Sequence, residues 1–184
     1  MGGAGFARFL DLAEADFRLA GAIGVQGVSF GGLFAAHLAA ADPRVGAVVV
    51  NGAPAAPTVP EFRTARERLA AALGTDAPDR IAEVMDALCF DPDRHRVACP
   101  LLLLHGGHDP LARYEDQEPF LRAADPVTAT LRIWPDGERT LYSHAAEPTR
   151  RPPPPRRTVP AVPTCETCFT WATRFLHSMK MKVQ

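Results

Sequence analysis

One short segment of the sequence, Gly27–Gly31, has the pattern Gly-x-Ser-x-Gly with Ser29 at its centre. The apolar run 22–28 before it predicts a buried strand, and apolar residues at helical spacing after it predict a helix. A strand, this pattern and a helix in succession predict a sharp turn that lifts a nucleophilic serine hydroxyl clear of a sheet. Glycine is expected on both sides of Ser29, because side chains there would collide. The alternative is a glycine-rich turn in which Ser29 is a bystander.

A candidate acid, Asp109, follows the run Leu101–Leu104 and the end of the predicted strand 99–105. A carboxylate just past the end of a buried strand could orient a histidine ring and stabilise its charged form during acyl transfer. The alternative is a helix N-cap, since Asp caps helices well and Pro110 suits a first helical turn.

The histidines near these residues have mostly structural interpretations. His37 falls on the apolar face of the helix after Ser29, so we predict a hydrogen-bonded core residue. His105 ends an apolar strand and is predicted to be a hydrogen-bonded structural residue, whereas the role of His108 stays open. The His105-x-x-His108-Asp109 spacing at a strand end gives poor ligand geometry, and we predict no metal site.

The four cysteines do not indicate metal or redox chemistry. Cys89 and Cys99 lie in apolar settings, which predicts buried small hydrophobic side chains. Cys165 and Cys168 form a lone C-x-x-C, and without a second pair this spacing does not predict a zinc or redox site.

Composition and charge argue against several classes of function. The 184 residues carry a net charge of −1, which gives no electrostatic basis for binding nucleic acid or a membrane surface. No apolar run has the length of a transmembrane helix, and the N-terminus lacks the basic and apolar regions of a signal peptide. We therefore expect a cytoplasmic protein. The hydrophobic content of 47% predicts one globular domain with a core.

Apolar runs and helical periodicity alternate along the chain. This alternation predicts an α/β fold, with a parallel sheet of about four strands flanked by helices and joined by right-handed crossovers. The predicted strands are 22–28, 45–50, 99–105 and 130–134, and helices are predicted near 6–13, 30–41, 62–73, 81–88 and 113–124.

A segment rich in proline and arginine interrupts this pattern at residues 148–163. We predict a domain over 1–147, a polyproline II or disordered linker over 148–163, and an amphipathic helix over 164–184 that docks back on the sheet. The run Pro152–Arg157 also fits the Pro-x-x-Pro-x-Arg pattern of ligands for aromatic grooves. The alternative is a plain linker, for which proline tracts are common.

Three segments together carry a resemblance to a known family: Ile23–Gly32 (IGVQGVSFGG), Cys99–Leu111 (CPLLLLHGGHDPL) and Ile133–Glu147 (IWPDGERTLYSHAAE). Over residues 6–147 the chain resembles the α/β-hydrolase superfamily. More narrowly, it is similar to the dienelactone-hydrolase-like branch, which includes pseudooxynicotine hydrolases and polyketide-shortening hydrolases. The resemblance implies hydrolysis of an ester, an amide or an activated carbon–carbon bond beside a carbonyl. It also implies a serine nucleophile, a small-molecule acyl substrate and no cofactor.

The resemblance implies roles for individual residues. Ser29 would be the nucleophile, Asp109 the acid of the triad, and the backbone N–H of Phe30 an oxyanion donor. Arg139 stands where the family places its catalytic histidine. Because a guanidinium donates hydrogen bonds and accepts none, it cannot act as a base, and His144 is the candidate base instead. The alternative for His144 is a solvent-facing loop histidine.

The chain matches only the C-terminal half of the family pattern, since it begins just before the serine turn. In the family, the loop that supplies the second oxyanion donor precedes this point, so we expect an impaired serine hydrolase. The alternative is a non-catalytic hydrolase remnant or an interaction module. Helices at about 61–88 are expected to form a small cap over the site. The unpaired edge of strand 22–28 is expected to favour a homo-oligomer.

Overall fold

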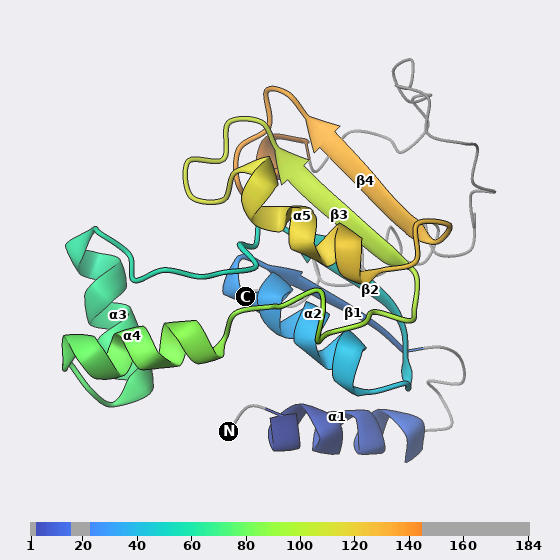
Figure 1. The fold of residues 1–184 in the computed structure, drawn as a ribbon, viewed down its shortest axis with the longest axis horizontal. Helices are drawn as coiled ribbons and strands as arrows, with labels where there is room; N and C mark the ends of the chain where they lie inside the picture. The colour runs from blue at the N-terminus through green and yellow to red at the C-terminus, as the bar shows by residue number, and fades with distance from the viewer. Residues whose placement is uncertain (1–2, 16–22, 145–184) are drawn as a thin grey trace, which may run out of the picture.

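The computed structural model describes residues 3–15 and 23–144 (Figure 1). The predicted linker 148–163 and C-terminal helix 164–184, with Cys165 and Cys168, lie outside these residues. No helix within the described ranges is both long enough and apolar enough to cross a membrane. The elements in chain order are α1 (Gly3–Ala15), β1 (Ile23–Val28), α2 (Phe30–Ala41), β2 (Val45–Asn51), α3 (Arg63–Leu73), α4 (Pro78–Ala87), β3 (Leu101–Gly106), α5 (Tyr114–Ala123), β4 (Ala129–Trp134) and the 3-10 helix η2 (Tyr142–His144).

The strands form one parallel four-stranded sheet in the order β1-β2-β3-β4. Each strand pairs with its neighbour in the sequence, as predicted. Helix α2 packs on β1 and β2, and α5 packs on β3 and β4, both in front of the sheet in Figure 1. Because parallel strands end at the same edge, the loops after β1, β3 and β4 all leave the sheet together, where α/β folds place their sites.

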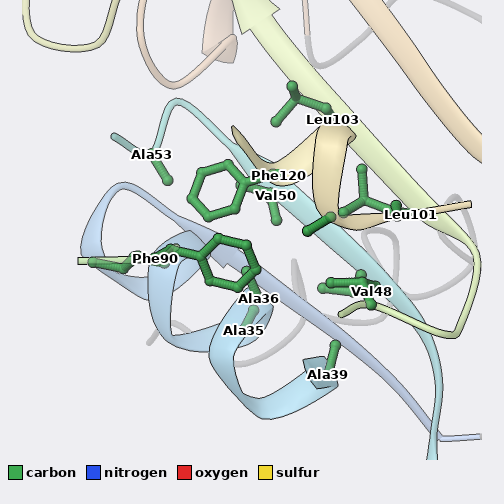
Figure 2. Close-up of a cluster of buried hydrophobic side chains, with 14 of the residues drawn as sticks. Ala35, Ala36, Ala39, Val48, Val50, Ala53, Phe90, Leu101, Leu103 and Phe120 are labelled. Carbon is green, nitrogen blue, oxygen red and sulfur yellow. The ribbon is translucent and has the colours of Figure 1, made fainter. Parts of the chain in front are cut away.

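The core lies between the sheet and the helices α2 and α5 (Figure 2). Alternate residues of a strand share a face, and those of β2 and β3 that face the helices are almost fully buried. The ring centroid of Phe120 on α5 lies 4.9 Å from that of Phe90, and both rings belong to this core. Helix α2 contributes small side chains, which allow it to approach the sheet closely. The buried residues of these elements include Val48, Val50, Leu101, Leu103, Ala35, Ala36 and Ala39.

Helices α3 and α4 form a pair that extends away from the sheet in Figure 1. Helix α3 buries none of its side chains, and α4 buries only Ile81 and Met85. The chain returns to the core at Phe90, whose N–H donates to the carbonyl oxygen of Ala55 at 2.7 Å. The predicted helices are therefore present, and their role as a cap over the site stays a prediction.

Two details differ from the expectations for residues 89–101. Strand β3 begins at Leu101 rather than Cys99, because Pro100 has no N–H to donate to the sheet. The carbonyl oxygen of Pro100 still accepts a hydrogen bond from the N–H of Val48 at 2.9 Å. Cys99 is buried as predicted, whereas Cys89 is only half-buried because it lies just past the C-terminal end of α4.

The two histidines predicted to be structural are hydrogen-bonded. His37 Nε2 lies 2.9 Å from the carbonyl oxygen of Leu88. The pKa of His37 is lowered, mainly because burial disfavours the charged ring and also because His95 lies beside it. His105 is buried, with its Nδ1 2.8 Å from Nε2 of Gln117.

Candidate active site

Ser29 lies in a sharp turn between β1 and α2. Its backbone has φ 58° and ψ −130°, a conformation that residues other than glycine rarely adopt. The N–H of Ser29 donates to the carbonyl oxygen of Asn51 at 2.9 Å, which ties the turn to the end of β2. Strained backbone of this kind clusters at functional sites, where the surrounding structure holds it in place.

Glycines allow this turn, although not at both of the predicted positions. A Cβ at Gly27 would lie 1.9 Å from the carbonyl oxygen of Gly31, so only glycine fits there. A Cβ at Gly31 would meet nothing within 4 Å, and the prediction that this glycine prevents a collision is therefore wrong. The second crowded position is Gly32, where a Cβ would lie 2.8 Å from the Cβ of Ala53.

Phe30 is the first residue of α2 and follows Ser29 directly. Helix N-termini present backbone N–H groups and a partial positive charge, which favour an anion. The N–H of Phe30 therefore lies at the N-terminus of α2, and its role as an oxyanion donor stays a prediction.

Asp109 lies just past the end of β3, and its side chain is 0% exposed. Its Oδ1 accepts hydrogen bonds from the N–H groups of Leu111 at 2.8 Å and Ala112 at 3.1 Å. The helix N-cap alternative for this residue is wrong, because α5 begins at Tyr114 with Arg113 as its N-cap. The carboxylate instead caps its own loop, and its role as the acid stays a prediction. Among the described residues, its Oδ2 is buried and has no hydrogen-bond partner.

Arg139 joins Ser29 to Asp109. Its Nη2 donates to Ser29 Oγ at 2.7 Å, and its Nη1 donates to Asp109 Oδ1 at 3.2 Å. The arginine side chain is 17% exposed, so this contact is partly shielded from solvent. Arg139 therefore lies between Ser29 and Asp109, and its guanidinium offers only donors there.

The loop after β4 that carries Arg139 is held by Glu138. The carboxylate of Glu138 accepts hydrogen bonds from the N–H and the Oγ1 of Thr140, both at 2.6 Å, and from the N–H of Tyr142 at 2.5 Å. These donors, the Thr140 hydroxyl first, lower the pKa of Glu138. The carbonyl oxygen of Thr140 also accepts a hydrogen bond from Nδ2 of Asn51 at 3.3 Å.

His144, the predicted base, is the last residue of η2 and lies near Trp134, the last residue of β4. Its Nε2 lies 3.5 Å from Oδ1 of Asp136, and its ring centroid lies 6.1 Å from that of Trp134. The side chain is 11% exposed. The structure thus brings Ser29 and Asp109 together with Arg139, and it holds His144 against Asp136 and Trp134.

A second layer of residues supports the acid loop, and sequence reasoning missed it. Gln117 is fully buried, and its Nε2 donates to His105 Nδ1 at 2.8 Å and to the carbonyl oxygen of Ala112 at 3.2 Å. Because Ala112 in turn donates to Asp109, α5 fixes the loop after β3. The available signal was a polar residue at a core-facing position of the predicted helix. Across residues 3–15 and 23–144, no group of three or more His, Cys, Asp and Glu side chains could hold a metal ion.

Solved structures resemble the chain, whereas no protein-family model and no curated protein sequence matches it. A 2,6-dihydroxy-pseudo-oxynicotine hydrolase has a TM-score of 0.67 and 23% identity, over 76% of this chain and 40% of its own. A structure named AbyA5 has a TM-score of 0.57 and 21% identity, over 75% and 43% of the two chains. The esterase domain of a Rhodothermus marinus protein has a TM-score of 0.50 and 20% identity, over 73% and 57%. These are α/β-hydrolase-fold proteins.

The chain has a partial α/β-hydrolase fold. It spans 40% of the pseudo-oxynicotine hydrolase and no more than 57% of the other two structures. The predicted fold class is confirmed, and so is the likeness to α/β-hydrolases. At these identities the likeness shows the fold alone.

Proposed function

We propose that this chain carries the nucleophile and the acid of a serine hydrolase whose turnover is suppressed. Ser29 would attack the carbonyl of a small-molecule ester, amide or activated carbon–carbon substrate, and the N–H of Phe30 would donate to the oxyanion. Asp109 would be the acid. No cofactor takes part in this chemistry, because a triad of this type needs only its own side chains.

The observation that carries the proposal is the pair of hydrogen bonds from Arg139 to Ser29 Oγ and Asp109 Oδ1. A histidine there would accept the serine proton and pass it to the leaving group, while Asp109 held its ring. A guanidinium keeps its protons. The two hydrogen bonds of Arg139 therefore support a triad-like arrangement that lacks the group needed to move the proton.

The unpartnered Oδ2 of Asp109 supports this interpretation. A buried acceptor without a donor is costly, at about 1–3 kcal/mol. A histidine in place of Arg139 would bring a ring N–H toward this carboxylate. Asp109 Oδ2, in the loop after β3, is therefore an acceptor to which Arg139 does not donate.

The second candidate is a non-catalytic α/β-hydrolase remnant that binds or interacts without chemistry. The same arginine favours this candidate, because Arg139 already donates hydrogen bonds to the Ser29 hydroxyl and to the Asp109 carboxylate. The two candidates differ in one respect: only the hydrolase should gain activity when a base is supplied at position 139.

The experiment measures hydrolysis of a short-chain nitrophenyl ester by the wild type, Ser29→Ala, Arg139→His and the double variant. We expect slow release by the wild type that Ser29→Ala abolishes. Arg139→His should raise the rate about a hundredfold or more, the usual contribution of a positioned general base. No gain in Arg139→His, with a native circular dichroism spectrum, would make the remnant the better account. A fluorophosphonate probe gives an independent readout, and we expect it to label wild-type Ser29 slowly.

A further inference from the structure

The bond between Arg139 and Ser29 affects the two halves of acyl transfer differently. In the first half, the serine must lose its proton. Nη2 of Arg139 donates to Ser29 Oγ at 2.7 Å, so the serine oxygen is held as an acceptor. A charged donor at this distance stabilises negative charge on an oxygen. The guanidinium therefore favours the alkoxide once a hydroxide ion from solvent removes the Ser29 proton.

The second half, release of the acyl group, needs a base for the attacking water. Arg139 cannot take that proton, since a guanidinium offers donors only. Asp109 is 0% exposed, and its Oδ1 already accepts from Leu111, Ala112 and Arg139. The other oxygen, Oδ2, is buried against Gly52, where a Cβ would lie 3.1 Å from it. Neither residue can therefore activate a water that approaches an acylated Ser29.

We propose that Ser29 accepts one acyl group from an activated carboxylic ester and then retains it. This inference rests on the proposed function, because it uses the same nucleophile and the same arginine. Hydroxide takes the Ser29 proton and becomes water, and the alkoxide forms a bond to the carbonyl carbon. The tetrahedral intermediate then expels the aryloxide, which breaks the carbon–oxygen bond to the leaving group. The product is an acyl ester on Ser29 Oγ.

The ligand class follows from this sequence of steps. Without a general acid to protonate the leaving group, the leaving group must be stable as an anion. An aryl ester meets that condition, whereas an amide or an alkyl ester does not. Ser29 therefore accepts acyl groups only from activated esters, because only their leaving groups depart without a proton.

The test treats the full 184-residue chain with p-nitrophenyl acetate and follows both products. We expect nitrophenolate release to stop at about one equivalent per chain, the burst that marks a stable acyl-enzyme. The intact mass should rise by one acetyl group, located on the peptide that contains Ser29. The burst should become faster as the pH rises. Ser29→Ala should show neither burst nor adduct, and the control Ser143→Ala, at an exposed serine, should show both.

Two variants of Arg139 test why the acyl group stays. Arg139→His should lose its acetyl group about a hundredfold or more faster than the wild type, because it supplies a base. Arg139→Ala should release its acetyl group faster when imidazole is added, whereas the wild type should not respond. The second variant keeps the test decisive if the first does not fold, as circular dichroism will show.

The outcomes separate this inference from the proposed function. Continued turnover by the wild type that depends on Ser29 would overturn retention of the acyl group and leave the hydrolase proposal standing. A burst in Arg139→His but no adduct on the wild type would also overturn it alone. No Ser29-dependent release from the wild type or from any Arg139 variant would overturn both.

Discussion

Gly52 lies directly against Arg139, so that a Cβ at Gly52 would fall 2.6 Å from the carbonyl oxygen of Arg139 and 3.2 Å from its Cγ. Gly52 also has a φ of +54°, in the left-handed region. Arg139 can therefore lie at this position only because the residue that follows β2 has no side chain.

The first prediction follows from this contact. Gly52→Ala should lower the free energy of unfolding by more than the roughly 1–2 kcal/mol that a left-handed backbone costs other residues, because the added methyl also displaces Arg139. Chemical denaturation measures the change. The matched control is Gly74→Ala, since Gly74 has a φ of +67° and nothing within 4 Å of a Cβ. An equal decrease in the free energy of unfolding for the two variants would show that the contact with Arg139 does not contribute to stability.

The second prediction concerns His144. Because Arg139 donates to both Ser29 Oγ and Asp109 Oδ1, His144→Ala should leave Ser29-dependent nitrophenolate release unchanged within about twofold. Ester hydrolysis by the variant and the wild type, at equal folded concentration, measures this. Loss of the Ser29-dependent rate in His144→Ala would instead identify this histidine as the base that the sequence predicts.

The third prediction concerns acid and the arginine loop. The pKa of Glu138 is lowered in the fold, chiefly by the Thr140 hydroxyl. Its stabilising effect should be fully present above 4.5, the ordinary pKa of this carboxyl, and should be lost as the pH falls through the lowered folded pKa. Thermal unfolding across this range should show a smaller acid-induced loss in Glu138→Gln than in the wild type. Glu118→Gln, at an exposed glutamate, is the control and should behave as the wild type.

The fourth prediction concerns the ring cluster under the end of α4, where His37 contacts the carbonyl of Leu88, the ring of Phe90 and the ring of His95. Burial lowers the pKa of His37, so the unfolded chain binds its proton more readily than the folded chain. Stability should therefore fall as the pH drops below the ordinary histidine value of 6.5 toward the lowered folded pKa.

His37→Gln, which can still donate to Leu88 but does not titrate, should show a weaker pH dependence of unfolding between neutral and mildly acidic pH. His108→Gln is the control, because His108 is exposed in the loop after β3. An unchanged pH dependence in His37→Gln would exclude His37 as the titrating group.

The fifth prediction concerns the outer edge of β1, which has one strand neighbour, β2, in the described sheet. Unpaired strand edges favour association, so we propose that the 184-residue chain self-associates through this edge. Light scattering should show a mass that rises with concentration, and Gln26→Lys on β1 should reduce it. Phe62→Lys, at an exposed residue before α3, should not. A compact monomer at high concentration would contradict the proposal.

The strands could be predicted from sequence because they are apolar runs, as in Val45–Val50 and Leu101–Leu104. The expected burial on both faces is incomplete, since Leu102 and Leu104 of β3 are only half-buried. Ser29 could be predicted because its turn depends on local residues. The need for glycine at position 32 could not be predicted from sequence. It arises because a Cβ there would collide with Ala53, and the packing of α2 on β2 brings these two residues together.

The rest of the site depends on contacts between distant residues. The resemblance gave the position of Arg139, but its side chain reaches Ser29 across 110 residues of sequence. Gln117 was missed for a related reason. A buried amide on an amphipathic helix acquires a role only when His105 and the Ala112 carbonyl are both within reach.

The sequential order of the strands also bears on how the chain is made. Domains fold from the N-terminus onward during synthesis, and each strand of this sheet needs only the strand made before it. A nascent chain that has emerged as far as β3 would already contain the turn at Ser29 and the strand before Asp109. Arg139 would arrive last, after β4. During translation the serine would therefore pass through a period without its arginine, open to reagents that the finished chain meets only with the guanidinium in place.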